Sequence, residues 1–119
     1  MSAAIVLFGH GSRDAGWRAP MDEVARRIRE RAPGRPVACA FLELQPPSLG
    51  EAVDDLVTAG AREVTVLPMF LGLGRHAREE LPTLVDQVRQ RHPGVLVRVL
   101  PSAGENPEVL DLLATAALR

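Results

Sequence analysis

The chain has 119 residues, 46% hydrophobic and 24% charged, which are proportions typical of a globular domain. Its formal net charge of −1 creates no global positive field that would attract nucleic acid or an anionic membrane. Its aromatic content of 3% also offers few surfaces on which unpaired bases could stack. We therefore expect a single domain over residues 1–119, with no nucleic-acid partner.

The single cysteine, Cys39, excludes an internal disulfide and a cysteine-based metal site. The apolar runs are too short to cross a bilayer, and the first residues lack the basic segment and apolar core of a secretory signal. These features predict a cytoplasmic protein without a membrane partner.

Four short apolar runs alternate along the chain with four helical patterns. The runs have the composition and turn boundaries of buried strands, and in chain order they cover residues 3–8, 36–42, 63–68 and 95–100. Apolar residues also recur at spacings of three and four, which predicts helices over residues 17–28, 49–57, 81–88 and 109–116. The alternation predicts an α/β fold with one four-stranded parallel sheet, in the order 2-1-3-4, and helices on both faces.

Residues at the helix ends agree with this arrangement. Ser48 and Glu51 have the spacing of a capping box, which predicts where the second helix begins. Pro82 suits the first turn of the third helix, where its missing N–H costs little. His92 lies where that helix ends, and an imidazolium there would interact favourably with the helix dipole, so we assign it no functional role.

Three chemically active residues follow successive predicted strands. His10 follows the first strand, Glu43 the second by 33 residues, and His76 lies a further 33 residues along, in the loop after the third. In such a sheet, ligands bind beyond the carboxyl ends of the strands, near the point where the strand order reverses. Two imidazoles and a carboxylate could bind Fe²⁺, Co²⁺, Ni²⁺ or Zn²⁺, and a neutral imidazole can also accept a proton.

Other interpretations of the same residues remain open. A strand-end histidine is often only hydrogen-bonded, a strand-end glutamate only solvated, and His76 could simply neighbour a helix cap. A phosphate-binding flavodoxin-like module would need a Gly/Ser/Thr-rich loop after the first strand, which GHGSRD matches poorly. A hydrolase would need a G-x-S-x-G elbow, which the sequence lacks.

Glycines flank both histidines. Gly9 and Gly11 surround His10, and Gly72 and Gly74 precede His76, so we expect two open loops that would admit a broad, flat ligand. Ser12 and the amides after it could serve a helix N-terminus, which favours anions, and nearby arginines could pair with carboxylates. The expected substrate-binding residues are Gly11, Ser12, Arg13, Gly74, Arg75 and Arg78.

The segments GHGSRD, AFLELQPPSL, LPMFLGLGRHAREELP and RHPGVLVRVLPSAGENPEVLDLL together resemble the CbiX family of sirohydrochlorin cobaltochelatases and ferrochelatases, within the class II chelatases. The resemblance covers essentially the whole chain. It implies insertion of Co²⁺, Fe²⁺ or Ni²⁺ into sirohydrochlorin or a related tetrapyrrole, on the path to cobalamin or sirohaem. The metal would be a substrate, with no permanently bound cofactor. His10 and His76 match the family's two metal-binding, catalytic histidines, and Glu43 matches the acidic residue that assists the metal site.

The resemblance also implies a chelatase-like fold, in which two similar α/β lobes surround a cleft. This chain carries one lobe, and the short members of the family pair as homodimers to rebuild the cleft. We therefore expect a homodimer, with Trp17 and Met21 as candidate interface residues. The alternative function is a non-catalytic carrier of metal or tetrapyrrole with the same fold. Glu80-Leu81-Pro82 stands where the family often has Asp-Ile-Pro, away from the proposed ligands.

Overall fold

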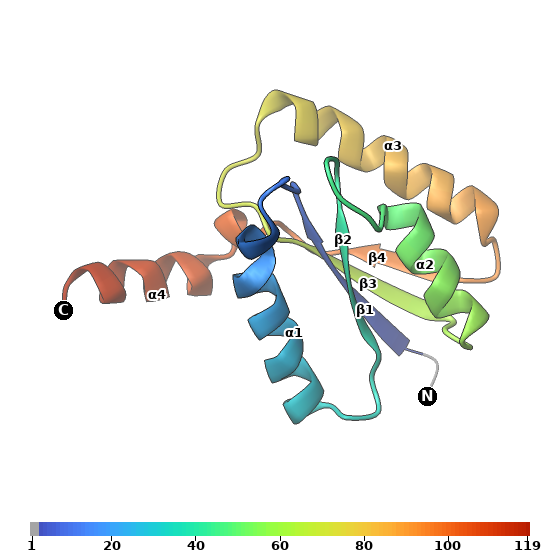
Figure 1. The fold of residues 1–119 in the computed structure, drawn as a ribbon, viewed down its shortest axis with the longest axis horizontal. Helices are drawn as coiled ribbons and strands as arrows, with labels where there is room; N and C mark the ends of the chain where they lie inside the picture. Colours follow the sequence, from blue (N-terminus) through green and yellow to red (C-terminus); the bar gives the residue numbers. More distant parts are fainter. Residues whose placement is uncertain (1–2) are drawn as a thin grey trace.

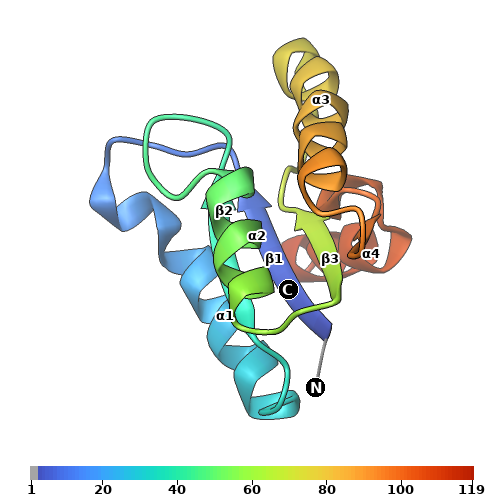
Figure 2. The ribbon, with the colours of Figure 1, turned by 90° about the vertical axis from the view of Figure 1, so that its right-hand side faces the viewer.

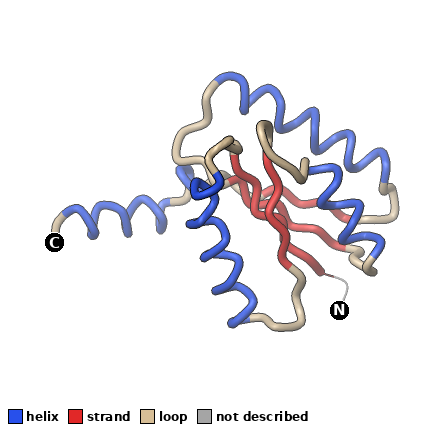
Figure 3. The backbone as a smooth tube through the Cα atoms, viewed as in Figure 1, coloured by secondary structure: helices blue, strands red, loops and turns tan. Residues whose placement is uncertain are grey.

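Four parallel strands form the centre of the computed structural model, which describes residues 3–119 (Figure 3). They pair in the order β2-β1-β3-β4, as predicted, and Leu7 of β1 lies opposite Cys39 of β2 and Leu67 of β3. Their bounds are β1 Ala3–Gly9, β2 Val37–Phe41, β3 Glu63–Pro68 and β4 Leu96–Val99. The predicted strands agree with these bounds to within one residue at each end.

Helices cover the two faces of the sheet unequally. One face carries α1, and the opposite face carries α2 and α3 (Figures 1 and 2). A fourth helix, α4, extends away from the sheet (Figure 1). The helices are α1 Ala19–Arg31, α2 Leu49–Thr58, α3 Arg75–Arg91 and α4 Pro107–Ala117, with short 3-10 helices η1 Ala15–Arg18 and η2 Ala103–Glu105.

Two hydrophobic cores result from the alternation of side chains along the strands. The larger core lies against α2 and α3, where Val6, Phe8 and Val66 are fully buried. The smaller core lies against α1, where Leu7 and Phe41 pack with the helix. Each fully buried side chain of this size contributes roughly 1.5–3 kcal/mol of transfer free energy, so the two cores hold the carboxyl ends of the strands firmly in place.

The capping box at the start of α2 is confirmed. The Ser48 hydroxyl accepts the Glu51 N–H at 3.1 Å, and the Ser48 N–H donates to the Glu51 carboxylate at 2.8 Å. At the end of α3, the His92 ring nitrogen Nε2 lies 2.7 Å from Asp54 Oδ1 of α2, and Arg91 also donates to Asp54. His92 therefore joins two helices, which agrees with its predicted lack of a functional role.

The prediction for Pro82 was wrong. Helix α3 begins at Arg75, so Pro82 lies in its interior and cannot donate to the Arg78 carbonyl. The first turns of α3 are mostly polar, and they therefore lack the apolar repeat from which the helix was predicted. Within residues 3–119, no helix has the length and apolar character needed to span a membrane.

Candidate active site at the carboxyl edge of the sheet

Backbone pairing continues past the ends of β1 and β2 and places Glu43 beside His10. The Leu42 N–H donates to the Gly9 carbonyl at 2.9 Å, and the Glu43 N–H donates to the His10 carbonyl at 3.1 Å. The two residues are therefore adjacent because of strand register, and their side chains remain available for chemistry.

Helix α3 brings His76 to the same edge. His76 is the second residue of α3, after the N-cap Gly74, and its ring Nε2 lies 3.4 Å from Glu43 Oε1. The side chains of His76 and Glu43 are 62% and 41% exposed. An imidazole and a carboxylate at this separation, open to solvent, form a donor pair that suits Fe²⁺, Co²⁺ or Ni²⁺.

The ring of His10 packs against the β3–α3 loop. It meets the ring of Phe70 edge-on, with centroids 6.4 Å apart at 90°. Among residues 3–119, no three side chains of His, Cys, Asp or Glu are close enough to hold one metal ion. The structure therefore brings the side chains of Glu43 and His76 into contact. Backbone pairing between two neighbouring segments places His10 beside Glu43. The described residues do not form a ready-made group of three ligands.

The glycines around His10 serve packing within the chain, which corrects the expectation of an open loop. A Cβ on Gly9 would lie 2.5 Å from the Met21 sulfur. Gly11 has φ of +100°, and a Cβ there would lie 1.8 Å from the Glu43 carbonyl oxygen. Gly11 therefore allows the Glu43 backbone to approach and, being buried, offers little surface to a ligand.

The glycines before His76 do match the expectation. A Cβ on Gly72 or Gly74 would meet nothing within 4 Å. There is therefore free space around Gly72 and Gly74 in the loop before α3, whereas the loop after β1 is closely packed.

The Ser12 hydroxyl accepts the Asp14 N–H at 3.0 Å at the start of the following 3-10 helix, but Ser12 is not the capping residue. Asp14 caps η1 instead, because its Oδ1 accepts the Gly16 N–H at 2.9 Å. Ser12 is held by Gln45, whose side-chain oxygen accepts the Ser12 N–H at 2.9 Å. The sequence analysis did not predict this role of Gln45. Its polar side chain, two residues after Glu43, could have indicated a contact at this edge of the sheet.

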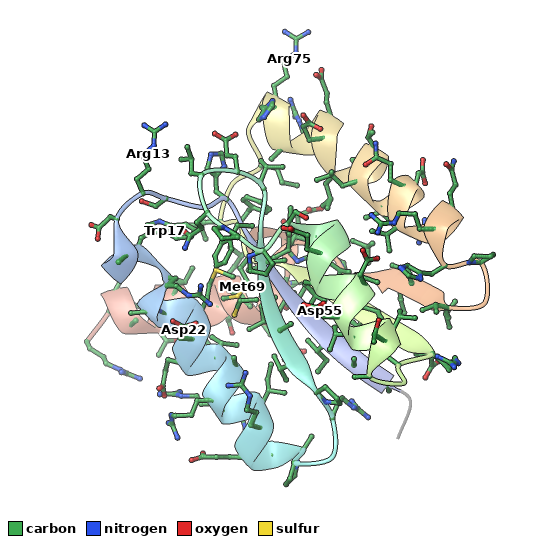
Figure 4. The ribbon with its side chains drawn as sticks, turned by 45° about the vertical axis from the view of Figure 1, so that its right-hand side comes forward. Arg13, Trp17, Asp22, Asp55, Met69 and Arg75 are labelled. Carbon is green, nitrogen blue, oxygen red and sulfur yellow. The ribbon has the colours of Figure 1, made fainter. Side chains whose placement is uncertain are left out.

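The predicted arginines lie on exposed surface at this edge. Arg13 and Arg75 extend outward from the β1–η1 loop and from the start of α3 (Figure 4). Arg75 pairs with Glu79 at 3.2 Å, but both side chains are exposed, so the pair is weak and easily exchanged for another anion. Arg78 is exposed on the same helix.

Two further residues at this edge were not predicted. Leu44, directly after Glu43, has φ of 70°, in the left-handed region that costs a non-glycine residue about 1–2 kcal/mol. Phe70 contacts His10 and also Phe8, at 6.0 Å between ring centroids. Neither role carries a sequence signal, since a strained leucine and a buried phenylalanine look like ordinary apolar residues.

The candidate interface residues differ in exposure. Trp17 is 40% exposed and packs on Phe41, with ring centroids 6.2 Å apart. Met21 is only 5% exposed and fills the space beside Gly9. Met21 is thus a core residue, and its expected place in an interface is corrected.

A comparison with protein-family models matches residues 4–118 to CbiX. The chain belongs to the CbiX family. Among curated relatives of this CbiX chain, a sirohydrochlorin cobaltochelatase of Methanopyrus kandleri is 33% identical over 82 residues, which are 69% of this chain and 57% of the relative. A chloroplastic sirohydrochlorin ferrochelatase of Arabidopsis thaliana is 28% identical over 109 residues, which are 92% of this chain and 48% of the relative.

Solved structures show the same fold. A CbiX protein from Marinobacter aquaeolei VT8 superposes with a TM-score of 0.81 at 33% identity, over 98% of this CbiX chain and 93% of that chain. The sirohydrochlorin chelatase SirB from Bacillus subtilis subspecies spizizenii, solved in complex with cobalt, gives 0.78 at 26% identity, over 97% and 49%. This CbiX chain spans about half the length of SirB and of several curated relatives that it matches.

Proposed function

We propose that this chain inserts a divalent metal ion into sirohydrochlorin or a related tetrapyrrole, using His10, Glu43 and His76. The observation that carries the proposal is the 3.4 Å contact between Glu43 and His76, exposed at the carboxyl edge of the sheet and beside His10. Relatives named sirohydrochlorin cobaltochelatase and ferrochelatase, and a relative solved with cobalt, support it.

Metal insertion makes three demands on a protein. The metal must lose water, two pyrrole N–H protons must leave, and the macrocycle must be held close to both events. Glu43 and His76 would bind the metal substrate together, and His10 would accept a proton from the ring. One imidazole nitrogen cannot ligate a metal and accept a proton at the same moment. We therefore assign metal binding to His76 and proton acceptance to His10.

The candidate site presents an exposed pair of one carboxylate and one imidazole. A chelatase must surrender its metal to four pyrrole nitrogens, and a closed site of three or four protein ligands would compete with that transfer. A solvent-exposed pair of one carboxylate and one imidazole would bind Co²⁺, Fe²⁺ or Ni²⁺ weakly enough to release it.

The surroundings of the pair suit a flat ligand with carboxylates. The loop at Gly72 and Gly74 is open, and Arg13, Arg75 and Arg78 are exposed nearby. Arginine forms planar, two-pronged contacts with carboxylates, so these side chains would hold the rim of the macrocycle.

A single sheet edge offers one wall to a ring that has two faces. We therefore propose a homodimer, in which a second copy supplies the other wall of the cleft. The cytoplasmic location predicted above stays a prediction.

A direct assay tests the proposed function. Purified protein is mixed with sirohydrochlorin and, in separate reactions, Co²⁺, Fe²⁺ or Ni²⁺, and the absorbance of the metallated ring is followed. We expect turnover well above the rate without protein for at least one metal. Stoichiometric binding of metal or ring without turnover would instead identify a carrier.

A further inference from the structure

Leu44 combines a strained backbone with an exposed apolar side chain. Among residues 3–119 it is the only residue other than glycine with a positive φ, which is 70°. The Cβ of leucine is crowded in this region, whereas glycine and asparagine tolerate it. The side chain is 48% exposed, so burial within the chain offsets little of the strain. Backbone strain of this kind is concentrated at functional sites, where the surrounding structure maintains it.

The neighbours of Leu44 hold the strained conformation in place. On one side, the Glu43 N–H donates to the His10 carbonyl at 3.1 Å. On the other side, the Gln45 side-chain oxygen accepts the Ser12 N–H at 2.9 Å. Leu44 is therefore fixed between two residues that are both hydrogen-bonded to the segment after β1, and it cannot relax without moving Glu43.

The place of Leu44 in the chain puts it beside the proposed metal pair. Adjacent Cα atoms are about 3.8 Å apart, and the carboxylate of the preceding residue, Glu43, lies 3.4 Å from the His76 ring. A macrocycle that takes a metal ion from Glu43 and His76 must bring its centre to that pair, and its pyrrole rings then extend over the neighbouring residues. Leu44 therefore lies within the area that a docked ring would cover.

Leu71 also has a fixed backbone and an exposed side chain. It follows Phe70, whose ring meets the His10 ring, and its own side chain is 68% exposed. The Gly104 N–H donates to the Phe70 carbonyl at 2.9 Å, and a Cβ on Gly104 would collide with the Leu71 carbonyl. Exposed apolar side chains thus adjoin the candidate site at two separate points of the chain.

We propose that Leu44, together with Leu71, forms an apolar contact for the tetrapyrrole beside the metal pair, and that the strained backbone of Leu44 is retained for this contact. The inference rests on the proposed function and adds the part of the substrate-binding surface that polar residues do not supply. Ligand sites are lined mainly by apolar side chains, with a few polar groups that fix orientation. The faces of a conjugated ring are apolar and its carboxylates lie on the rim, so leucines suit the faces and arginines suit the rim.

The same contact would affect the metal pair. The side chains of Glu43 and His76 are 41% and 62% exposed, so water reaches a metal ion bound there before the ring arrives. Leucine side chains covered by the ring would exclude water from this neighbourhood, which strengthens the electrostatic attraction between the metal ion and its incoming ligands. Leu44 and Leu71 are therefore positioning residues, which bind no metal and transfer no proton.

Substitution by asparagine separates the two properties of Leu44. Asparagine is close to leucine in size and shape and tolerates a positive φ, but its side chain is polar. Leu44→Asn should therefore keep or raise the melting temperature. Sirohydrochlorin binding without metal should weaken by about fivefold or more, because the ring no longer buries the exposed half of a leucine. The change in sirohydrochlorin absorbance as protein is added measures this affinity.

Three matched variants complete the test. Leu44→Met keeps an apolar side chain and should restore near-normal ring affinity, whereas Leu71→Asn should weaken it. Leu118→Asn removes a leucine that is 87% exposed directly after α4, away from the candidate site, and should change neither ring affinity nor melting temperature. Co²⁺ binding without the ring, measured by calorimetry, should be the same in all variants, because Glu43 and His76 are intact.

Each contrary result overturns the inference in its own way. Normal ring affinity in Leu44→Asn would refute the apolar contact and leave the proposed function standing. A clear fall in the melting temperature of Leu44→Asn would show that this leucine serves folding. A change of mass in light scattering would assign Leu44 to an interface between copies. If the unmodified protein bound Co²⁺ but no sirohydrochlorin, the proposed function itself would be refuted, and this inference with it.

Discussion

At the scale of single residues, backbone and side chain have separate tasks at the candidate site. Main-chain hydrogen bonds and the close approach at Gly11 set the position of Glu43. The side chains of His10, Glu43 and His76 add little to the hydrophobic cores, since all three are exposed. Substitutions there should change chemistry without changing the fold.

We expect His10→Ala to lower the proposed chelatase turnover by about a hundredfold, as is usual when a group that transfers protons is removed. We expect His76→Ala to lower it strongly as well, because Glu43 would then be left without its partner in binding the metal substrate. Melting temperatures should stay close to that of the unmodified protein, because surface substitutions usually change stability by less than about 0.5 kcal/mol. Steady-state assays and thermal melts of the same preparations check both statements.

His92→Ala is the matched control for these variants. It should keep full turnover but melt at a lower temperature, since Asp54 loses one of its two partners, the His92 ring at 2.7 Å, and keeps only Arg91. Normal turnover in both the His10 and His76 variants would remove them from the proposed mechanism.

Gly11 and Gly72 provide a second test at this scale. Gly11→Ala places a Cβ where the Glu43 carbonyl lies and adds strain at positive φ, so it should cost at least about 2 kcal/mol. For a domain of this size the melting temperature should fall by about 8 °C or more. In Gly72→Ala the added Cβ would lie in open space, so the melting temperature should change little. Equal melting temperatures for the two variants would contradict the packing role of Gly11.

At the scale of secondary-structure elements, α3 contains a local conflict. Pro82 interrupts the hydrogen bonding of a helix that runs from Arg75 to Arg91. Proline in a helix interior is about 3 kcal/mol less favourable than alanine. The helix persists despite this cost because α3 packs on α2 and β4.

We therefore expect Pro82→Ala to raise the free energy of unfolding by at least about 1 kcal/mol, because the new N–H can donate to the Arg78 carbonyl. Denaturant unfolding measures the gain. Thr83→Ala, at the next exposed position, should change the free energy by less than about 0.5 kcal/mol. A Pro82→Ala protein less stable than the unmodified one would contradict this expectation and would mean that the contacts of the proline ring outweigh the missing hydrogen bond.

Helix α1 makes a pH-dependent contribution through Glu23. Hydrogen bonds from Arg26, and then from Arg27, lower the pKa of Glu23 from 4.5 to about 2. A carboxyl with a depressed folded-state pKa stabilises the protein above its unfolded pKa and loses that contribution as the pH falls through the folded value. The relevant window is therefore from about pH 4.5 down to about pH 2.

We expect unfolding free energy to fall less steeply across that window in Glu23→Gln than in the unmodified protein. Denaturant titrations at several pH values measure the two slopes. Because these side chains are exposed, high salt should shrink the difference. Identical slopes at low salt would show that the arginine contacts do not persist in solution.

The sequence predicted the bounds and order of the strands better than it predicted the surfaces against which the helices pack. The strand bounds followed from apolar runs bounded by turn residues, which are local signals. The strand order 2-1-3-4, adopted as a common order for doubly wound sheets, was also confirmed. The start of α3 was missed because its first turns are mostly polar and carry no apolar repeat, and the placement of α4 was missed because it depends on the surface that the helix meets. At the site, the edge and the three residues were predictable from strand ends, whereas the packing of Gly9 against Met21 depends on how α1 docks.

At the scale of the whole molecule, one sheet and three packed helices form a domain whose fourth helix lies outside the cores. If the cleft is shared between two copies, turnover per chain should fall when the protein is diluted through its dimer dissociation constant. Assays over a wide range of protein concentration, at fixed substrate, measure this. Constant turnover per chain where light scattering reports single chains would show that one copy is sufficient.

The backbone attachment of Glu43 has an evolutionary consequence. Because neighbouring amides and carbonyls position residue 43, a mutation of its codon would change the proposed ligand and leave the backbone where it is. Single mutations could therefore place a carboxylate, an amide or an imidazole at position 43 with little loss of folding stability. Metal preference along this sheet edge could then change by single substitutions, long before the architecture had to change.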